Sequence, residues 1–200
     1  MLIDVEESQL VLVDFQPKLQ AVMHDAQSVW SNATRLAQAA RLLEVPVWGT
    51  EQNPSKLGGL PPELREVCQR VLAKMQFSAV EEGLAEWLQP PPAAPRGNAR
   101  SLPRHLQKPQ PEQAARKSIV LAGVEAHVCL LQTALDLLDE EFEVWVVTDA
   151  CTSRTERNRD AAYDRLAGAG AELVTTEMVV FEWLRSAEHP DFKAVQALIK

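Results

Sequence analysis

Five short apolar segments constrain the fold of this 200-residue chain more than any other feature. They read QLVLVDF (9–15), VPVWGT (45–50), SIVLAGV (118–124), FEVWVVT (142–148) and AELVTT (171–176). Continuous apolar runs of this length are typical of strands that are covered on both faces, as in parallel sheets. We therefore expect these segments to form a mainly parallel, Rossmann-like central sheet.

Helical patterns lie between the apolar segments. Apolar spacing predicts a helix over 29–43, prolines and acids at the start predict one over 61–72, and others are expected over 78–88, 157–170 and from Pro190 onward. Gly168 and Gly170 are expected to stop the fourth helix as a C-cap. This alternation predicts a three-layer α/β/α fold, and 200 residues with 46% hydrophobic content suit one domain spanning 1–200.

One segment, 89–111, does not fit that alternation. It is proline-rich, basic and poor in large apolar side chains, so we expect an exposed loop or a disordered insertion. A lid, an oligomer contact and a plain tether all stay open as its function.

Composition and charge exclude several classes of protein. A net charge of −8 argues against a nucleic-acid binder, whose binding surface would be basic. No stretch approaches the roughly 20 apolar residues that span a bilayer, and the acidic N-terminus does not resemble a secretory signal. Three cysteines without a CxxC motif suit a reducing compartment. We expect a cytoplasmic protein with no membrane partner.

Ligands of parallel α/β sheets gather at the carboxyl ends of the strands, which directs attention to Asp14, Thr50 to Gln52 and Gly123 to Cys129. If a helix begins near Ala126, the Cys129 thiol lies in its first turn, where its pKa would be lowered. Cys129 could also be a small core residue, and Asp14 could be a helix N-cap. By itself Lys74 is more typical of a solvated surface lysine.

The segments LVLVDFQPKL, ARLLEVPVWGTEQNPSKLGGL, AKMQFSAV, VLAGVEAHVCLLQTALDLL and EVWVVTDACTSR together resemble the isochorismatase-like cysteine hydrolase family. The resemblance runs from about residue 8 to the C-terminus, interrupted by the proline-rich segment, and TEQNPSKLG is similar to the branch of isochorismatase domain-containing proteins. It implies a catalytic triad of Asp14, Lys74 and Cys129. It also implies a cis peptide at Val124–Glu125, with the amides of Glu125 and Cys129 forming an oxyanion hole, and a homo-oligomer.

Departures from the family narrow the expected chemistry. Nicotinamidases of the family hold a metal through an aspartate and two histidines after the second strand, whereas this chain reads Thr-Glu-Gln-Asn over 50–53. We predict no metal and no cofactor. A cysteine nucleophile favours cleavage of a carbon–nitrogen bond in a small amide or ureide. The candidate substrate contacts are Phe15, Glu51, Gln52, Phe77 and His127.

Two other functional classes remain to be weighed. The chain could be a catalytically idle scaffold that keeps the hydrolase fold and uses its surface for partners. A nucleotide-binding doubly wound domain is disfavoured because no GxGxxG follows any of the predicted strands. Cys68 and Cys151 are both expected to be packing residues.

Overall fold

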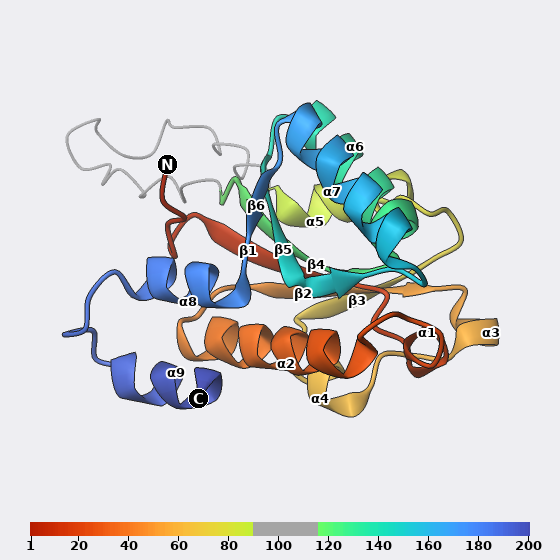
Figure 1. Cartoon of the computed structure of the whole chain (residues 1–200). Coiled ribbons are helices and arrows are strands. Elements are labelled where there is room, and N and C mark those ends of the chain that lie inside the picture. The colour runs from red at the N-terminus through yellow and green to blue at the C-terminus, as the bar shows by residue number, and fades with distance from the viewer. Residues whose placement is uncertain (90–115) are drawn as a thin grey trace, which may run out of the picture.

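A six-stranded parallel sheet runs through the computed structural model, which describes residues 1–89 and 116–200 (Figure 1). Its order is β3-β2-β1-β4-β5-β6, and every neighbouring pair is parallel. The five predicted strands are confirmed, although β5 is longer and β6 is shorter than predicted. The strand bounds are β1 Ser8–Val13, β2 Val47–Gln52, β3 Arg70–Lys74, β4 Ser118–Val124, β5 Glu143–Thr152 and β6 Glu172–Val174.

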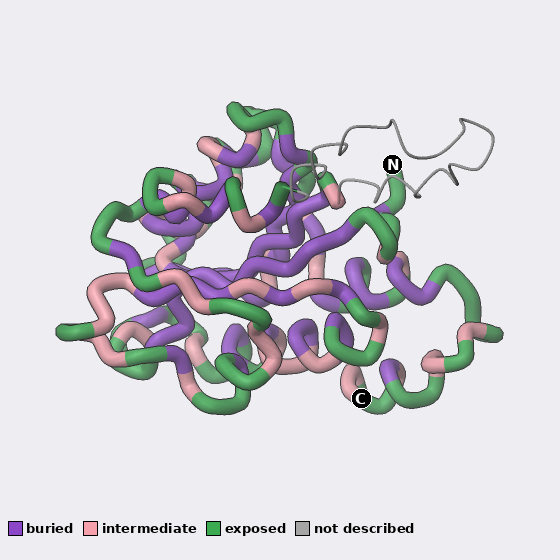
Figure 2. The backbone as a smooth tube through the Cα atoms, turned by 180° about the vertical axis from the view of Figure 1, so that it is seen from behind, coloured by how far each residue is buried: buried purple, intermediate pink, exposed green. Residues whose placement is uncertain are grey.

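Helices cover both faces of this sheet, which confirms the three-layer α/β/α class. One face carries α2 (Ala26–Leu42), α4 (Pro62–Arg65), α8 (Thr176–Leu184) and α9 (Phe192–Ile199), and the other carries α5 (Leu84–Leu88), α6 (Leu131–Asp139) and α7 (Glu156–Ala169) (Figure 1). Each face has its own apolar cluster, so the central strands β1 and β4 are buried from both sides, whereas the edge strands β3 and β6 are partly exposed (Figure 2). The short helices α1 (Pro17–Gln20) and α3 (Pro54–Leu57) contact each other where β1 and β2 end.

The prediction of a helix over 61–72 is wrong. Only its first turn forms, as α4, and the chain then enters β3, which pairs with β2 at the edge of the sheet. The Arg70 guanidinium of β3 lies 3.7 Å from the centroid of the Trp87 ring, a cation–π contact that ties this edge strand to α5. Long-range pairing has overridden a local helical pattern, and it places Lys74 at the carboxyl end of a strand.

Other predicted helix boundaries shift for local reasons. Gly83, at φ 91°, divides the helix predicted over 78–88 into the 3₁₀ turn η1 (Val80–Glu82) and α5. Gly168 lies inside α7, and Gly170, at φ 102°, is the glycine that caps it. The helix α8 was not predicted. The segment predicted as an insertion lies outside the described residues from position 90 onward.

Gly123 of β4 pairs with Val13 of β1, the residue before Asp14. A Cβ atom added there would lie 2.5 Å from the carbonyl oxygen of Val13, far inside van der Waals contact. Because backbone cannot yield as a flexible side chain can, Gly123→Ala is expected to lower the free energy of unfolding by at least about 2 kcal/mol. Denaturant unfolding measures this loss.

The matched control for that substitution is Gly168→Ala. A Cβ at position 168 meets no atom within 4 Å, and the residue is helical. Alanine there should stabilise the protein by about 0.5–1 kcal/mol. Equal effects of the two substitutions would contradict the close approach of β4 to β1.

Candidate active site

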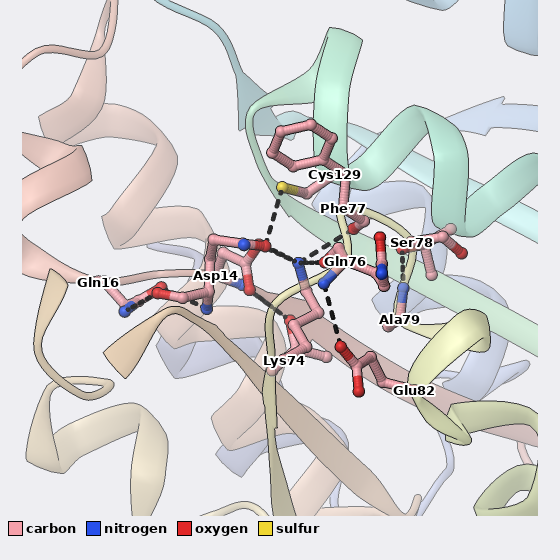
Figure 3. A network of polar contacts seen from close by, with 12 residues as sticks. Asp14, Gln16, Lys74, Gln76, Phe77, Ser78, Ala79, Glu82 and Cys129 are labelled. Atoms are coloured by element: carbon pink, nitrogen blue, oxygen red, sulfur yellow. Dashed lines mark hydrogen bonds and ion pairs between the residues drawn. The ribbon is translucent and has the colours of Figure 1, made fainter. Parts of the chain in front are cut away.

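Three predicted catalytic residues meet at the carboxyl ends of three strands (Figure 3). Asp14 follows β1, Lys74 ends β3, and Cys129 lies in the π-helical turn η3 (Ala126–Leu130) between β4 and α6. The Nζ atom of Lys74 lies 2.8 Å from Oδ2 of Asp14, and neither side chain is exposed to solvent. Asp14 is therefore not a helix N-cap, since Gln16 holds that position in α1, and Lys74 is not a surface lysine.

The Lys74 ammonium is surrounded by hydrogen-bond acceptors. Besides its ion pair with Asp14, it donates to Oε1 of Gln52 at 2.6 Å and to the carbonyl oxygens of Phe77 at 3.0 Å and Gln76 at 3.3 Å. Its three protons are thus all engaged. A buried charge is tolerated only when it is paired and hydrogen-bonded in this way.

The two carboxylate oxygens of Asp14 have different surroundings. Thr50 donates its hydroxyl to Oδ1 at 2.7 Å. Oδ2 is buried, makes its ion pair with Lys74 and receives no hydrogen bond from the residues that the structure describes. This oxygen therefore has the free lone pair that a general base in the site needs.

Cys129 is nearly buried, and its pKa differs in direction from the prediction. Burial first and the Asp14 carboxylate second raise the pKa of the Cys129 thiol to about 12, and the opposing effect of Lys74 is smaller. The predicted lowering by the helix start is wrong. With its pKa raised in this way, Cys129 is a thiol at neutral pH, and its Sγ atom lies 3.8 Å from Oε1 of Gln52.

This raised pKa has a measurable consequence. Because only the thiolate attacks an alkylating reagent, the rate of Cys129 alkylation by iodoacetamide should rise about tenfold per pH unit from pH 7 to beyond pH 9. Peptide-level mass spectrometry follows Cys129 separately from Cys68 and Cys151. A rate that levels off below pH 8 would contradict the raised pKa of the thiol.

The structure places the five candidate substrate contacts in different surroundings. Gln52 lies between Lys74 and Cys129 as described, and Phe77 is half exposed, with its ring projecting on the side of the Cys129 sulfur (Figure 3). His127 is held by Ser153 at 2.9 Å and Asn158 at 3.3 Å, so both ring nitrogens already have partners.

The prediction that Glu51 and Phe15 contact the substrate is wrong. Successive side chains of β2 point to opposite faces, so Glu51 turns away from Gln52, accepts from the amide of Leu60 at 2.8 Å and pairs with Arg65. Phe15 is fully buried in the core, with its ring centroid 4.9 Å from that of Trp30.

Gln16 is a supporting residue that the sequence did not single out. Its side-chain oxygen accepts from the amide of Gln52 at 2.8 Å, and its side-chain nitrogen donates to the carbonyl of Gln52 at 3.0 Å and to that of Gly58. This bidentate contact fixes the end of β2. The sequence signal that could have identified Gln16 is its position two residues after Asp14, at the end of a predicted strand.

Comparison with known proteins identifies the family of this chain. The profile of the isochorismatase domain matches residues 105–178. Over 193 residues, the chain is 39% identical to isochorismatase domain-containing protein 2 of Bos taurus, which covers 96% of this chain and 83% of that protein. The chain belongs to the isochorismatase family. The human protein of the same name is also 39% identical over the same shares.

Solved structures agree with this family assignment. The MAR1 ribonuclease of Caenorhabditis elegans superimposes with a TM-score of 0.83 at 31% identity, covering 100% of this chain and 92% of that one. The YcaC gene product of Escherichia coli, an octameric hydrolase of unknown specificity, superimposes at 0.74 with 24% identity over 98% and 95% of the two chains. The second likeness concerns the fold alone.

Two further features of this isochorismatase-family chain are a cis peptide bond before the thiol and the arrangement of side chains that could bind a metal. The peptide bond between Val124 and Glu125 is cis, and the Glu125 carboxylate pairs with Arg154 at 2.9 Å. Within residues 1–89 and 116–200, no three histidine, cysteine or acidic side chains gather as metal ligands would. In the same residues, no helix has the length and apolarity needed to cross a membrane.

Proposed function

We propose that the protein is a cysteine hydrolase that cleaves a carbon–nitrogen bond of a small amide-like substrate. The observation that carries this proposal is the meeting of Asp14, Lys74 and Cys129, which come from segments far apart in the sequence and share one buried contact region. A carboxylate, an ammonium and a thiol at one site supply a base, a fixed positive charge and a nucleophile.

The first half of the reaction forms an acyl enzyme. Asp14 Oδ2 takes the proton of the Cys129 thiol, and the thiolate attacks the amide carbon. The carbon–nitrogen bond then breaks, and Asp14 returns the proton to the leaving nitrogen. Lys74 keeps its charge throughout and stabilises the thiolate as it forms.

The second half releases the acid product. Asp14 takes a proton from water, the resulting hydroxide attacks the thioester carbon, and Cys129 leaves and recovers its proton. In both halves, the substrate carbonyl oxygen becomes negative when its carbon is attacked, and the backbone amides of Glu125 and Cys129 donate hydrogen bonds to it. One such donor contributes roughly 2.7–4 kcal/mol to transition-state stabilisation.

A panel of small amides, ureides and nitriles tests this proposal with the purified protein. Release of ammonia or amine from at least one class, saturable in substrate, is the expected result. Failure of every class, with Cys129 unreactive even at high pH, would favour the idle scaffold that keeps only the fold.

RNA belongs in the same panel, because a relative of 31% identity is described as a ribonuclease. The net charge of −8 opposes binding of a polyanion, so we expect no RNA cleavage. Cleavage that persists after loss of the Cys129 thiol would identify a different site or a contaminant.

The oligomeric state and the cellular location of the protein are also proposals. We propose a homo-oligomer, supported by the octameric relative of the same fold, and light scattering of the purified protein measures its size. We also propose a cytoplasmic location, supported by three free cysteines, and fractionation of cells that express the chain tests it.

A further inference from the structure

Gln52 makes a contact that the proposed reaction does not use. Its Oε1 atom lies 2.6 Å from Lys74 Nζ and 3.8 Å from Cys129 Sγ, so one carbonyl oxygen faces both the ammonium and the thiol. Its Nε2 atom donates to the carbonyl of Met75 at 2.8 Å.

These partners fix the orientation of the amide. If the amide were flipped, its NH₂ group would face the Lys74 ammonium, and its oxygen would face the Met75 carbonyl. The backbone of Gln52 is held as well, since Gln16 bonds both its amide and its carbonyl. The oxygen of Gln52 is therefore held toward the sulfur.

A carbonyl oxygen beside a sulfur atom favours the protonated form. It accepts a hydrogen bond from the S–H group, whereas its lone pairs repel a thiolate. We propose that Gln52 is a positioning residue that holds Cys129 as an unreactive thiol until substrate displaces the Gln52 carbonyl. The proton is then free to pass to Oδ2 of Asp14, the buried oxygen that receives no hydrogen bond from the described part of the chain. The step moves one proton and forms one thiolate and one carboxylic acid.

The displacement by substrate rests on the proposed hydrolase function, but the hold on the thiol does not. It is tested by alkylation with iodoacetamide, which requires no turnover. Gln52→Met removes the carbonyl and keeps the length of the side chain. Loss of one such hydrogen bond should accelerate alkylation of Cys129 at pH 8 by about three- to tenfold.

Gln52→Glu is the opposing variant, because it keeps the shape and adds a negative charge beside the sulfur. It should slow the same alkylation by about tenfold or more, with the pH profile displaced to higher pH. Gln69→Met is the matched control, since Gln69 is exposed, lies just before β3 and stands outside the site. It should leave the rate unchanged.

Peptide-level mass spectrometry reads the rates at Cys129, and thermal unfolding shows that each variant is folded. A rate unchanged or slowed by Gln52→Met would overturn the inference. Acceleration by both Gln52 variants would also overturn it, because loosened packing and not the carbonyl would then control the thiol. If Gln52→Met accelerates alkylation but the amide panel shows no turnover, the hold on the thiol stands and the proposed function fails.

Discussion

Cys129→Ala is expected to abolish amide hydrolysis, with a loss of at least about 10⁴-fold in kcat/KM. The reason is chemical, since neither Asp14 nor Lys74 can form the acyl enzyme in place of the sulfur. Removing one nearly buried sulfur atom should lower the free energy of unfolding by only about 1 kcal/mol. Steady-state kinetics on the best substrate of the panel and denaturant unfolding measure the two effects.

Cys151→Ala provides the control. Cys151 is also buried, but it lies in β5 with its sulfur 3.9 Å from the carbonyl of Leu121, and the groups that act on its pKa include neither Asp14 nor Lys74. This variant should lose a similar amount of stability and keep full activity. Hydrolysis that survives Cys129→Ala undiminished would remove Cys129 from the mechanism.

Lys74→Met is expected to damage both stability and activity. It leaves the Asp14 carboxylate buried without its counter-charge, which should lower the free energy of unfolding by about 3–5 kcal/mol. It also removes the charge that, among the described residues, opposes the high pKa of Cys129, so kcat should fall by at least about 100-fold. Urea unfolding and single-turnover kinetics give the two quantities.

A double variant separates the ion pair from simple packing. Adding Asp14→Asn to Lys74→Met removes the stranded charge, so it should restore part of the lost stability while activity stays absent. Lys18→Met is the surface control, because Lys18 is exposed and its side chain donates to the carbonyl of Lys56, so it differs from Lys74 both in burial and in partner. If Lys74→Met and Lys18→Met destabilise equally, the buried ion pair is not formed.

The strands were predictable where their patterns were local. Five apolar runs identified five strands, because a strand buried on both faces needs a continuous apolar segment wherever it lies in the sheet. β3 was not predicted because Arg70–Lys74 is short, lies at the edge and follows a proline-led helical turn. The sequence pattern of that turn continues into the strand, so it predicts one helix over 61–72. The pairing of β3 with β2 is a long-range contact that no local pattern contains.

The candidate site was predictable by residue type but not by orientation. Asp14 and Cys129 stand at strand ends, and the family resemblance supplied Lys74. Gln52 and Glu51 are neighbours at the end of β2, and only the phase of that strand decides that the first faces the thiol and the second faces Arg65. Both faces of the strand are covered, so the sequence carries no alternation from which to read this phase.

By itself the sequence determined the α/β class, the sheet-end position of the functional residues and the family, because these follow from hydrophobic periodicity and from local motifs. Only the tertiary structure decided that Lys74 is buried against Asp14, that the Cys129 thiol has a raised pKa, and that Gln52 faces its sulfur. The physical reason is that burial and charge pairing depend on groups brought together from distant segments, whereas strand and helix patterns depend on near neighbours in the chain.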